Sequence, residues 1–255
     1  MQILDTRSND DLQAEPASDR LVDDLRQDIL SGRYAPDSRL IEESISRERG
    51  VSRTPVRHAL RALEQEGLLH RLPRRGYRVR SYTIDEVADA IEVRGELEAI
   101  AARIHAEHGW NADARAAIAQ IVSEGKALIS KRRIDDQAQL RWAELNLAFH
   151  DALVLRTGNV GLVVAYEQLK RIPLVSPRAV LFERSAEDVS HRQISAAQAD
   201  HDRVVRAIDE RKGQRAAEIM RDHAIRSGEN KRQNFHGILA NEFLVGDLGA
   251  ALVKA

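Results

Sequence analysis

Apolar residues in the first third of the chain recur every three or four positions, which is the spacing of helices that bury one face. This pattern predicts three short helices, at about residues 18–32, 41–50 and 52–66. Ser52 can cap the third helix, and Pro55 suits its first turn. The polar and acidic residues 1–18 that precede the helices predict a disordered tail.

The pattern changes after the third helix. Residues 68–72 and 77–80 read as two short strands, and the segment Pro73-Arg74-Arg75-Gly76 between them reads as a basic turn. Three helices followed by a basic hairpin describe a winged helix-turn-helix, which we expect to span residues 19–80.

A long helical region follows a predicted linker at residues 81–83. Thr83 and Glu86 form a capping-box pattern that starts a helix reaching Gly109. Its predicted buried stripe consists of Val93, Leu97, Ile100 and Ile104. Further helices are predicted at residues 112–131, 137–156, 160–171, 186–211 and 214–235, and no strand pattern interrupts them. We therefore predict a mainly α protein, with an all-helical bundle at residues 84–236 and a C-terminal tail at 237–255.

Charge is distributed unevenly along a chain whose formal net charge is only -1. Residues 47–80 contain ten Arg and no Lys, against three Glu. Arg53, Arg57 and Arg61 repeat every fourth residue and so form one stripe on the third helix. A solvated basic face is the simpler explanation of such a stripe. The exclusive use of Arg, whose planar fork fits guanine edges and phosphates, instead favours nucleic acid as the partner.

Composition excludes several classes of site. The chain has no Cys, which removes disulfides, thiolate metal sites and Cys nucleophiles. No apolar run approaches the roughly 20 residues that span a bilayer, and the acidic N-terminus lacks the pattern of a signal peptide. We therefore expect a cytoplasmic protein with no membrane partner.

Three histidines lie on the apolar sides of three different predicted helices. His150 follows Asn146 by one turn, His201 accompanies Val204 and Ile208, and His223 follows Met220. Each alone can be a hydrogen-bonded core histidine. Three neutral imidazoles together suit Zn, Ni, Fe or Cu and leave a coordination position open for a ligand.

An open metal position also allows catalysis, so a metal-dependent hydrolase with an accessory nucleic-acid-binding domain is the alternative function. Hydrolysis needs a general base near the metal. Asp151 directly follows His150, and Asp200 directly precedes His201. Neighbouring helical residues project about 100° apart, so we expect both carboxylates to face away from the metal. A purely architectural DNA-binding protein would leave the histidines unexplained.

Two segments in the N-terminal region carry a family resemblance. Leu30-Ser-Gly-Arg-Tyr-Ala-Pro-Asp-Ser-Arg-Leu40 and Gly50-Val-Ser-Arg-Thr-Pro-Val-Arg57 resemble the DNA-binding domain of the GntR family of bacterial transcription regulators. The resemblance implies a homodimer on double-stranded operator DNA. The residues that it places on DNA are Ser52, Arg53, Thr54 and Arg57 of the third helix, and Arg74, Arg75 and Gly76 of the wing.

The bundle resembles the effector domain (FCD) of the FadR-type branch of that family, in which three His and one Asp hold a metal. The implied ligands are His150, His201 and His223, with Asn146 at the Asp position as a weaker fourth. Zn and Ni are the favoured ions. Segments around Arg94, His150 and His223 are most similar to vanillate-responsive repressors.

The resemblance also implies an effector site. Arg94 would meet the carboxylate of a small organic acid, and Trp142 and Phe149 would cover its apolar or aromatic body. An ordinary surface ion pair between Arg94 and Glu98, one turn apart, is the alternative. We therefore expect a dimeric repressor that an acid of the vanillate type releases from an inverted-repeat operator.

Overall fold

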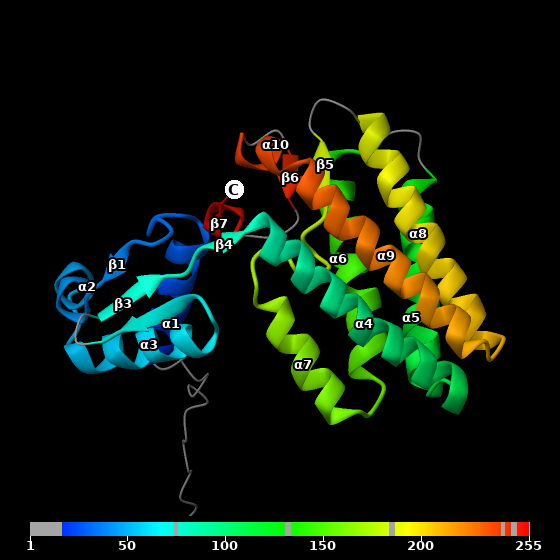
Figure 1. Ribbon diagram of the computed structural model, residues 1–255, viewed down its shortest axis with the longest axis horizontal. Coiled ribbons are helices and arrows are strands. Elements are labelled where there is room, and N and C mark those ends of the chain that lie inside the picture. Colours follow the sequence, from blue (N-terminus) through cyan, green and yellow to red (C-terminus); the bar gives the residue numbers. More distant parts are fainter. Residues whose placement is uncertain are drawn as a thin grey trace, which may run out of the picture.

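An N-terminal domain of three helices and a small sheet is joined to a larger helical domain (Figure 1). The computed structural model describes residues 17–73, 76–130, 134–183, 187–240, 243–245 and 249–254. Most of the expected disordered tail lies outside these ranges. Among the described helices, none combines the length and the apolar character needed to cross a membrane.

The N-terminal domain has the predicted winged helix-turn-helix architecture. Its elements are α1 (Ala17–Leu30), β1 (Arg39–Leu40), α2 (Glu42–Arg49), α3 (Arg53–Gln65), β2 (Leu69–Leu72) and β3 (Gly76–Val79). The strands form an antiparallel sheet in the order β1-β3-β2. Gly50 ends α2 with φ 65°, a left-handed conformation that glycine adopts without strain, and so allows the tight turn into α3.

The C-terminal domain is the predicted helical bundle. Its helices are α4 (Ile84–His108), α5 (Ala112–Ile129), α6 (Asp136–Leu155), α7 (Val160–Lys170), α8 (Glu187–Asp209) and α9 (Gly213–Gln233). The capping box that begins α4 is present, since Glu86 N donates to Thr83 Oγ1 at 3.2 Å and Thr83 N donates to Glu86 Oε2 at 2.7 Å. Helices α4 and α9 lie side by side (Figure 1). At their contact a Cβ on Gly95 would come within 2.2 Å of the Ala224 Cβ.

The predicted buried stripe of α4 is wrong at Val93, which is 53% exposed, whereas Leu97, Ile100 and Ile104 are partly buried against the core. Arg94 and Glu98 face the interior with 2% and 0% exposure. Helix α9 approaches α4 closely, which requires small residues such as Gly95 where the two helices meet. Arg94 and Glu98 can be buried because their opposite charges pair with each other. A periodicity analysis places charged residues outside by default and therefore misses that Arg94 and Glu98 are buried.

The expectation that no strand accompanies the bundle is also wrong. Strand β5 (Leu181–Glu183) pairs antiparallel with β6 (Phe243–Val245), which follows α10 (Phe235–Leu239). The 3-10 helix η1 (Ala250–Leu252) leads into β7 (Val253–Lys254), which pairs in parallel with β4 (Tyr82–Thr83), the predicted linker. The C-terminal residues thus lie between the two domains (Figure 1).

Leu252 is fully buried in a hydrophobic cluster that contains residues of both domains, and η1 contacts α1. Leu252→Ala is expected to lower the free energy of unfolding by roughly 2–5 kcal/mol, because it leaves a cavity where the side chain was. Thermal or urea unfolding would measure the loss. Lys254→Ala is the matched control: Lys254 pairs with Asp37 at 3.2 Å across the same contact but is half exposed, so its loss should cost less than about 1 kcal/mol. Equal effects of the two substitutions would contradict the packing argument.

Candidate functional site

Three helices bring the three predicted histidines together inside the bundle. His150 comes from α6, His201 from α8 and His223 from α9, and all three are buried. One ring nitrogen of each lies within 4.8 Å of those of the other two. The ring centroids are 5.2 to 5.3 Å apart. This separation leaves room for one ion between the rings.

Several buried atoms around this point lack hydrogen-bond partners among the described residues. They include both ring nitrogens of His150, Nε2 of His201, Oδ1 of Asn146 and both carboxylate oxygens of Glu98. The amide nitrogen of Asn146 donates to the carbonyl of Pro177 at 2.6 Å, so its oxygen is the atom left over. Buried polar atoms without partners are costly, and several around one point are typical of a missing ion. The residues therefore fit a divalent metal with three imidazole ligands and one amide oxygen.

Carboxylates stand behind two of the imidazoles. Nδ1 of His223 donates to Asp200 Oδ2 at 3.2 Å, and in metal sites such a hydrogen bond orients the ring so that its other nitrogen faces the ion. Glu98 Oε1 lies 2.9 Å from Nδ1 of His150, without hydrogen-bond geometry. Sequence reasoning missed both roles, although the spacing of Glu98 one turn after Arg94 marked it as a possible partner.

Asp200 was expected to face away from the site, and that prediction is wrong. Helix α8 contacts both α5 and α9, so neighbouring residues 200 and 201 can both be buried. Burial alone would raise the pKa of Asp200, but hydrogen bonds from His223, Arg203 and Arg226 outweigh it and hold the pKa well below its usual range. Asp151 faces elsewhere as expected, and accepts hydrogen bonds from Tyr166 and Lys170.

The electrostatics of the histidines suit metal binding. Burial, and secondly the nearby His223, lower the pKa of His150 and of His201 well below 6.5. Both rings are therefore neutral at physiological pH, with a lone pair free for an ion. Burial raises the pKa of Glu98, and the charge of Arg94 opposes that rise.

Arg94 points inward, as the effector prediction requires, but it is already paired. Its Nε lies 3.2 Å from Glu98 Oε1, and its guanidinium also donates to the carbonyl of Val175. The ion pair of the alternative interpretation therefore exists, although in the interior rather than on the surface.

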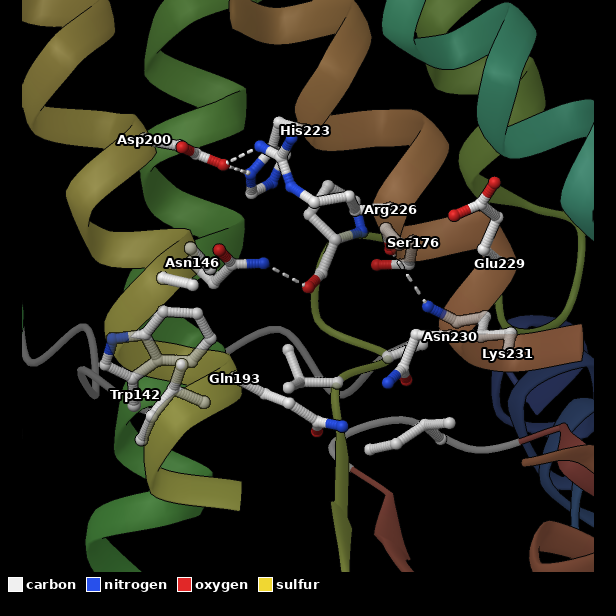
Figure 2. Close-up of a pocket in the computed structure, with 18 of the residues that line it drawn as sticks. Trp142, Asn146, Ser176, Gln193, Asp200, His223, Arg226, Glu229, Asn230 and Lys231 are labelled. Carbon is white, nitrogen blue, oxygen red and sulfur yellow. Dashed lines mark hydrogen bonds and ion pairs between the residues drawn. The ribbon is translucent and has the colours of Figure 1, made fainter. Parts of the chain in front are cut away.

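A cavity of about 320 Å³ opens beside His223, one of the three histidines. Arg94, Trp142 and Asn146 line it as well, whereas His150 and His201 are not among its lining residues (Figure 2). Phe149 lies elsewhere: it is fully buried and stacks on His201 with a ring distance of 3.9 Å, outside the lining of this cavity. Its predicted contact with the effector stays a prediction. Lys231 is among the lining residues that sequence reasoning missed.

The predicted DNA-contacting residues of α3 lie together at the start of that helix. Ser52, Arg53, Thr54 and Arg57 are all exposed. Arg53 pairs with Glu43 and Arg57 with Glu42, both at 2.9 Å. Nucleic acid phosphates or base edges would have to replace these acidic partners from α2.

The predicted wing tip is only partly described. Arg74 and Arg75 lie outside the described residues. Gly76 has φ 84°, and a Cβ there would come within 2.5 Å of the Leu40 carbonyl oxygen. The pairing of β1 with β3 therefore explains this glycine by itself, without any contact to DNA.

Comparisons with known proteins agree with this architecture. Residues 17–79 match the bacterial regulatory proteins of the gntR family, and residues 89–226 match the FCD domain. The HTH-type transcriptional repressor GlaR of Escherichia coli K12 is 28% identical over 204 residues, which cover 79% of this chain and 89% of GlaR. The HTH-type transcriptional repressor RspR of the same strain is 25% identical over 219 residues, or 86% of this chain and 90% of RspR.

A solved structure shows a related fold. It is that of Lar, which controls the expression of the Listeria monocytogenes agr system, and it matches with a TM-score of 0.60 at 15% identity. The match covers 87% of this chain and 99% of Lar. An identity this low shows a shared fold and no shared ligand.

Proposed function

Because the chain belongs to the GntR family of bacterial regulatory proteins and carries an FCD domain, we propose that it is a metal-containing repressor released from its operator by a small carboxylate. It acts as a homodimer on an inverted repeat, since one helix-turn-helix reads only a few base pairs.

Family membership confirms the predicted class, a DNA-binding transcription regulator. The family and the relatives GlaR and RspR are regulators and not enzymes, so the hydrolase alternative is set aside. The hydrogen bonds of Asp200 agree with this conclusion. Its carboxylate is held by His223, Arg203 and Arg226, which leaves it poorly suited to act as a general base.

The observation that carries the effector proposal is the cluster of three buried histidines next to a cavity that His223 and Asn146 line. A divalent ion held by three neutral imidazoles and an amide would supply a full positive charge and an open position for an anion. In a buried cavity, that charge attracts a carboxylate more strongly than it would in water. Arg94, which is paired with Glu98, lines the same cavity and can donate to an anion there, and Trp142 offers an apolar surface for the body of the acid. An aromatic acid of the vanillate type stays a prediction from resemblance.

The chain connects the cavity to the DNA-binding domain by two routes. Helix α4, which carries Arg94, begins directly after β4. Leu181 of β5 lines the cavity and pairs with β6, and the same C-terminal segment continues to β7, which pairs with β4. An acid that favours one arrangement of the cavity wall would thereby shift the position of the winged domain.

The test of the function is operator binding in the presence of candidate acids. We expect acids to weaken binding by the wild-type protein, and His201→Ala to bind the operator while losing that response. Neutral analogues such as the aldehyde should have no effect. Release of DNA by the aldehyde at equal concentration, or an unaltered acid response in His201→Ala, would reject the proposal. Full-affinity binding of a monomer to one half-site would reject the dimer.

Arg53→Ala is expected to weaken operator binding by roughly 1–3 kcal/mol and to relax the sequence preference, because Arg53 stands at the exposed start of α3. Titration with the operator and with a scrambled duplex would measure both effects. Arg103→Ala, which removes an exposed Arg from the bundle, is the matched control. Arg75→Ala should instead reduce the salt dependence of binding more than the preference. Unchanged operator affinity in Arg53→Ala would exclude this docking.

A further inference from the structure

One buried cation in the cavity has no role in the metal site. Lys231, from the last turns of α9, is 4% exposed, and Figure 2 shows it on the opposite side of the cavity from Trp142 and Asn146. Its Nζ donates to the hydroxyl of Ser227 at 3.4 Å. No carboxylate among the residues that the structure describes lies within ion-pair distance of it. Glu229 lines the same cavity but is exposed and makes no ion pair with Lys231.

A buried amine without a counter-ion destabilises the protein that contains it. Lysine is almost never fully buried unless it is paired. Burial, and secondly the charge of Arg94, lower the pKa of Lys231 to about 7. The amine is therefore poised between its neutral and charged forms near neutral pH, and an anion beside it would favour the charged form. An apolar side chain of similar size would fill this position without the free-energy cost of burying an amine.

The position of Lys231 relative to the metal site is defined by one helix. His223, Ser227 and Lys231 are spaced by four residues and so lie on one face of α9. Eight residues of helix correspond to a rise of about 12 Å. Ser176 and Asn230 also line the cavity near Lys231 and carry groups that can donate hydrogen bonds (Figure 2). The cavity thus extends from His223, at the proposed metal site, to Lys231 two turns away.

We propose that Lys231 binds a second anionic group of the effector, so that the cavity takes a small acid with a carboxylate or similar oxyanion at each end. This inference rests on the proposed function, because the first carboxylate is the one that binds at the histidines. A monocarboxylate would leave the amine of Lys231 without a partner. An acid of the vanillate type presents a neutral phenol at this end, so the two classes of effector can be told apart.

The test uses the full-length protein loaded with Zn and bound to operator DNA. Linear dicarboxylates of increasing length are each compared with the monocarboxylate of the same length, and benzenedicarboxylates with benzoate. For at least one length we expect the diacid to release DNA at a concentration about tenfold or more below that of its monoacid. Such a difference in affinity corresponds to one strong polar contact between the second carboxylate and the protein. Lys231→Met should abolish this ratio and Lys231→Arg should preserve much of it. Lys212→Met, which removes an exposed lysine next to the same helix, should leave the ratio unchanged.

A second measurement separates a ligand-binding role from a structural one. Lys231→Met should raise the melting temperature of the protein without added acid, because it removes a buried amine and keeps the volume of the side chain. A lowered melting temperature would assign Lys231 to the structure and overturn the proposal. Equal potency of diacids and monoacids, or an unchanged ratio in Lys231→Met, would overturn it while leaving the proposed function intact. If neither class of acid released DNA or shifted the melting temperature, the proposed function would fail, and this inference with it.

Discussion

His201→Ala is expected to abolish metal binding by the purified protein. His201 supplies one of three imidazole nitrogens that converge within 4.8 Å, and its Nε2 has no other partner among the described residues. Loss of a residue that only orients a ligand costs roughly 10- to 100-fold in metal affinity, and loss of a ligand itself should cost more. Elemental analysis of protein purified without a chelator or a His-tag would measure the metal content of the variant and of the wild type. In the wild type, Zn or Ni should also raise the melting temperature, because the ion binds only the folded state.

Two matched variants sharpen this test. His191→Ala removes another histidine of α8, one whose ring contacts the carbonyl of Ile129 far from the cluster, and should keep the metal. Asn146→Asp should tighten binding, because it places a negative charge where the structure has a neutral amide oxygen without a partner. Wild-type protein that contains no metal and shows no thermal shift with Zn or Ni would disprove the site.

Arg94→Ala is expected to destabilise the bundle by roughly 3–5 kcal/mol, because it leaves Glu98 as a buried charge without its partner. Both side chains are almost completely buried, and Arg94 Nε lies 3.2 Å from Glu98 Oε1. The backbone carbonyl of Val175 would lose its donor as well. Thermal or urea unfolding of the metal-free protein would measure the loss.

A double variant tests whether the unpaired charge is the cause. Arg94→Met combined with Glu98→Gln removes both charges and keeps most of the volume, so it should recover much of the stability lost in Arg94→Ala. Equal stability of Arg94→Ala and the wild type would refute the buried pair. Because of this structural role, the effect of Arg94 on the acid response is better tested with Arg94→Lys, which keeps a positive charge.

Local patterns were enough to predict the elements that depend on neighbouring residues in the chain. The capping box at Thr83 and Glu86 involves residues three positions apart, and it is present in the structure. The turn at Gly50 follows from the conformational freedom of glycine. The winged helix-turn-helix and the helical bundle were predicted for the same reason. His150, His201 and His223 could be found because each lies on the apolar face of its own helix.

Other features depend on contacts between segments that are distant in the chain. The C-terminal strands β6 and β7 are three and two residues long, too short for a periodic signal, and they form by pairing with β5 and β4. Leu252 is buried because residues from both domains, distant from it in the chain, form the cluster that covers it.

By itself, the sequence determined the helices, the winged domain and the residue types that can hold a metal, because spacing along one helix decides which side chains share a face. The tertiary structure alone decided how buried charges are compensated. Arg94 and Glu98 face inward because α9 approaches α4 closely and the two charges pair. Asp200 is part of the site because His223 reaches it from another helix. The free energy of a buried charge depends on partners from several elements at once, and no single stretch of sequence contains them.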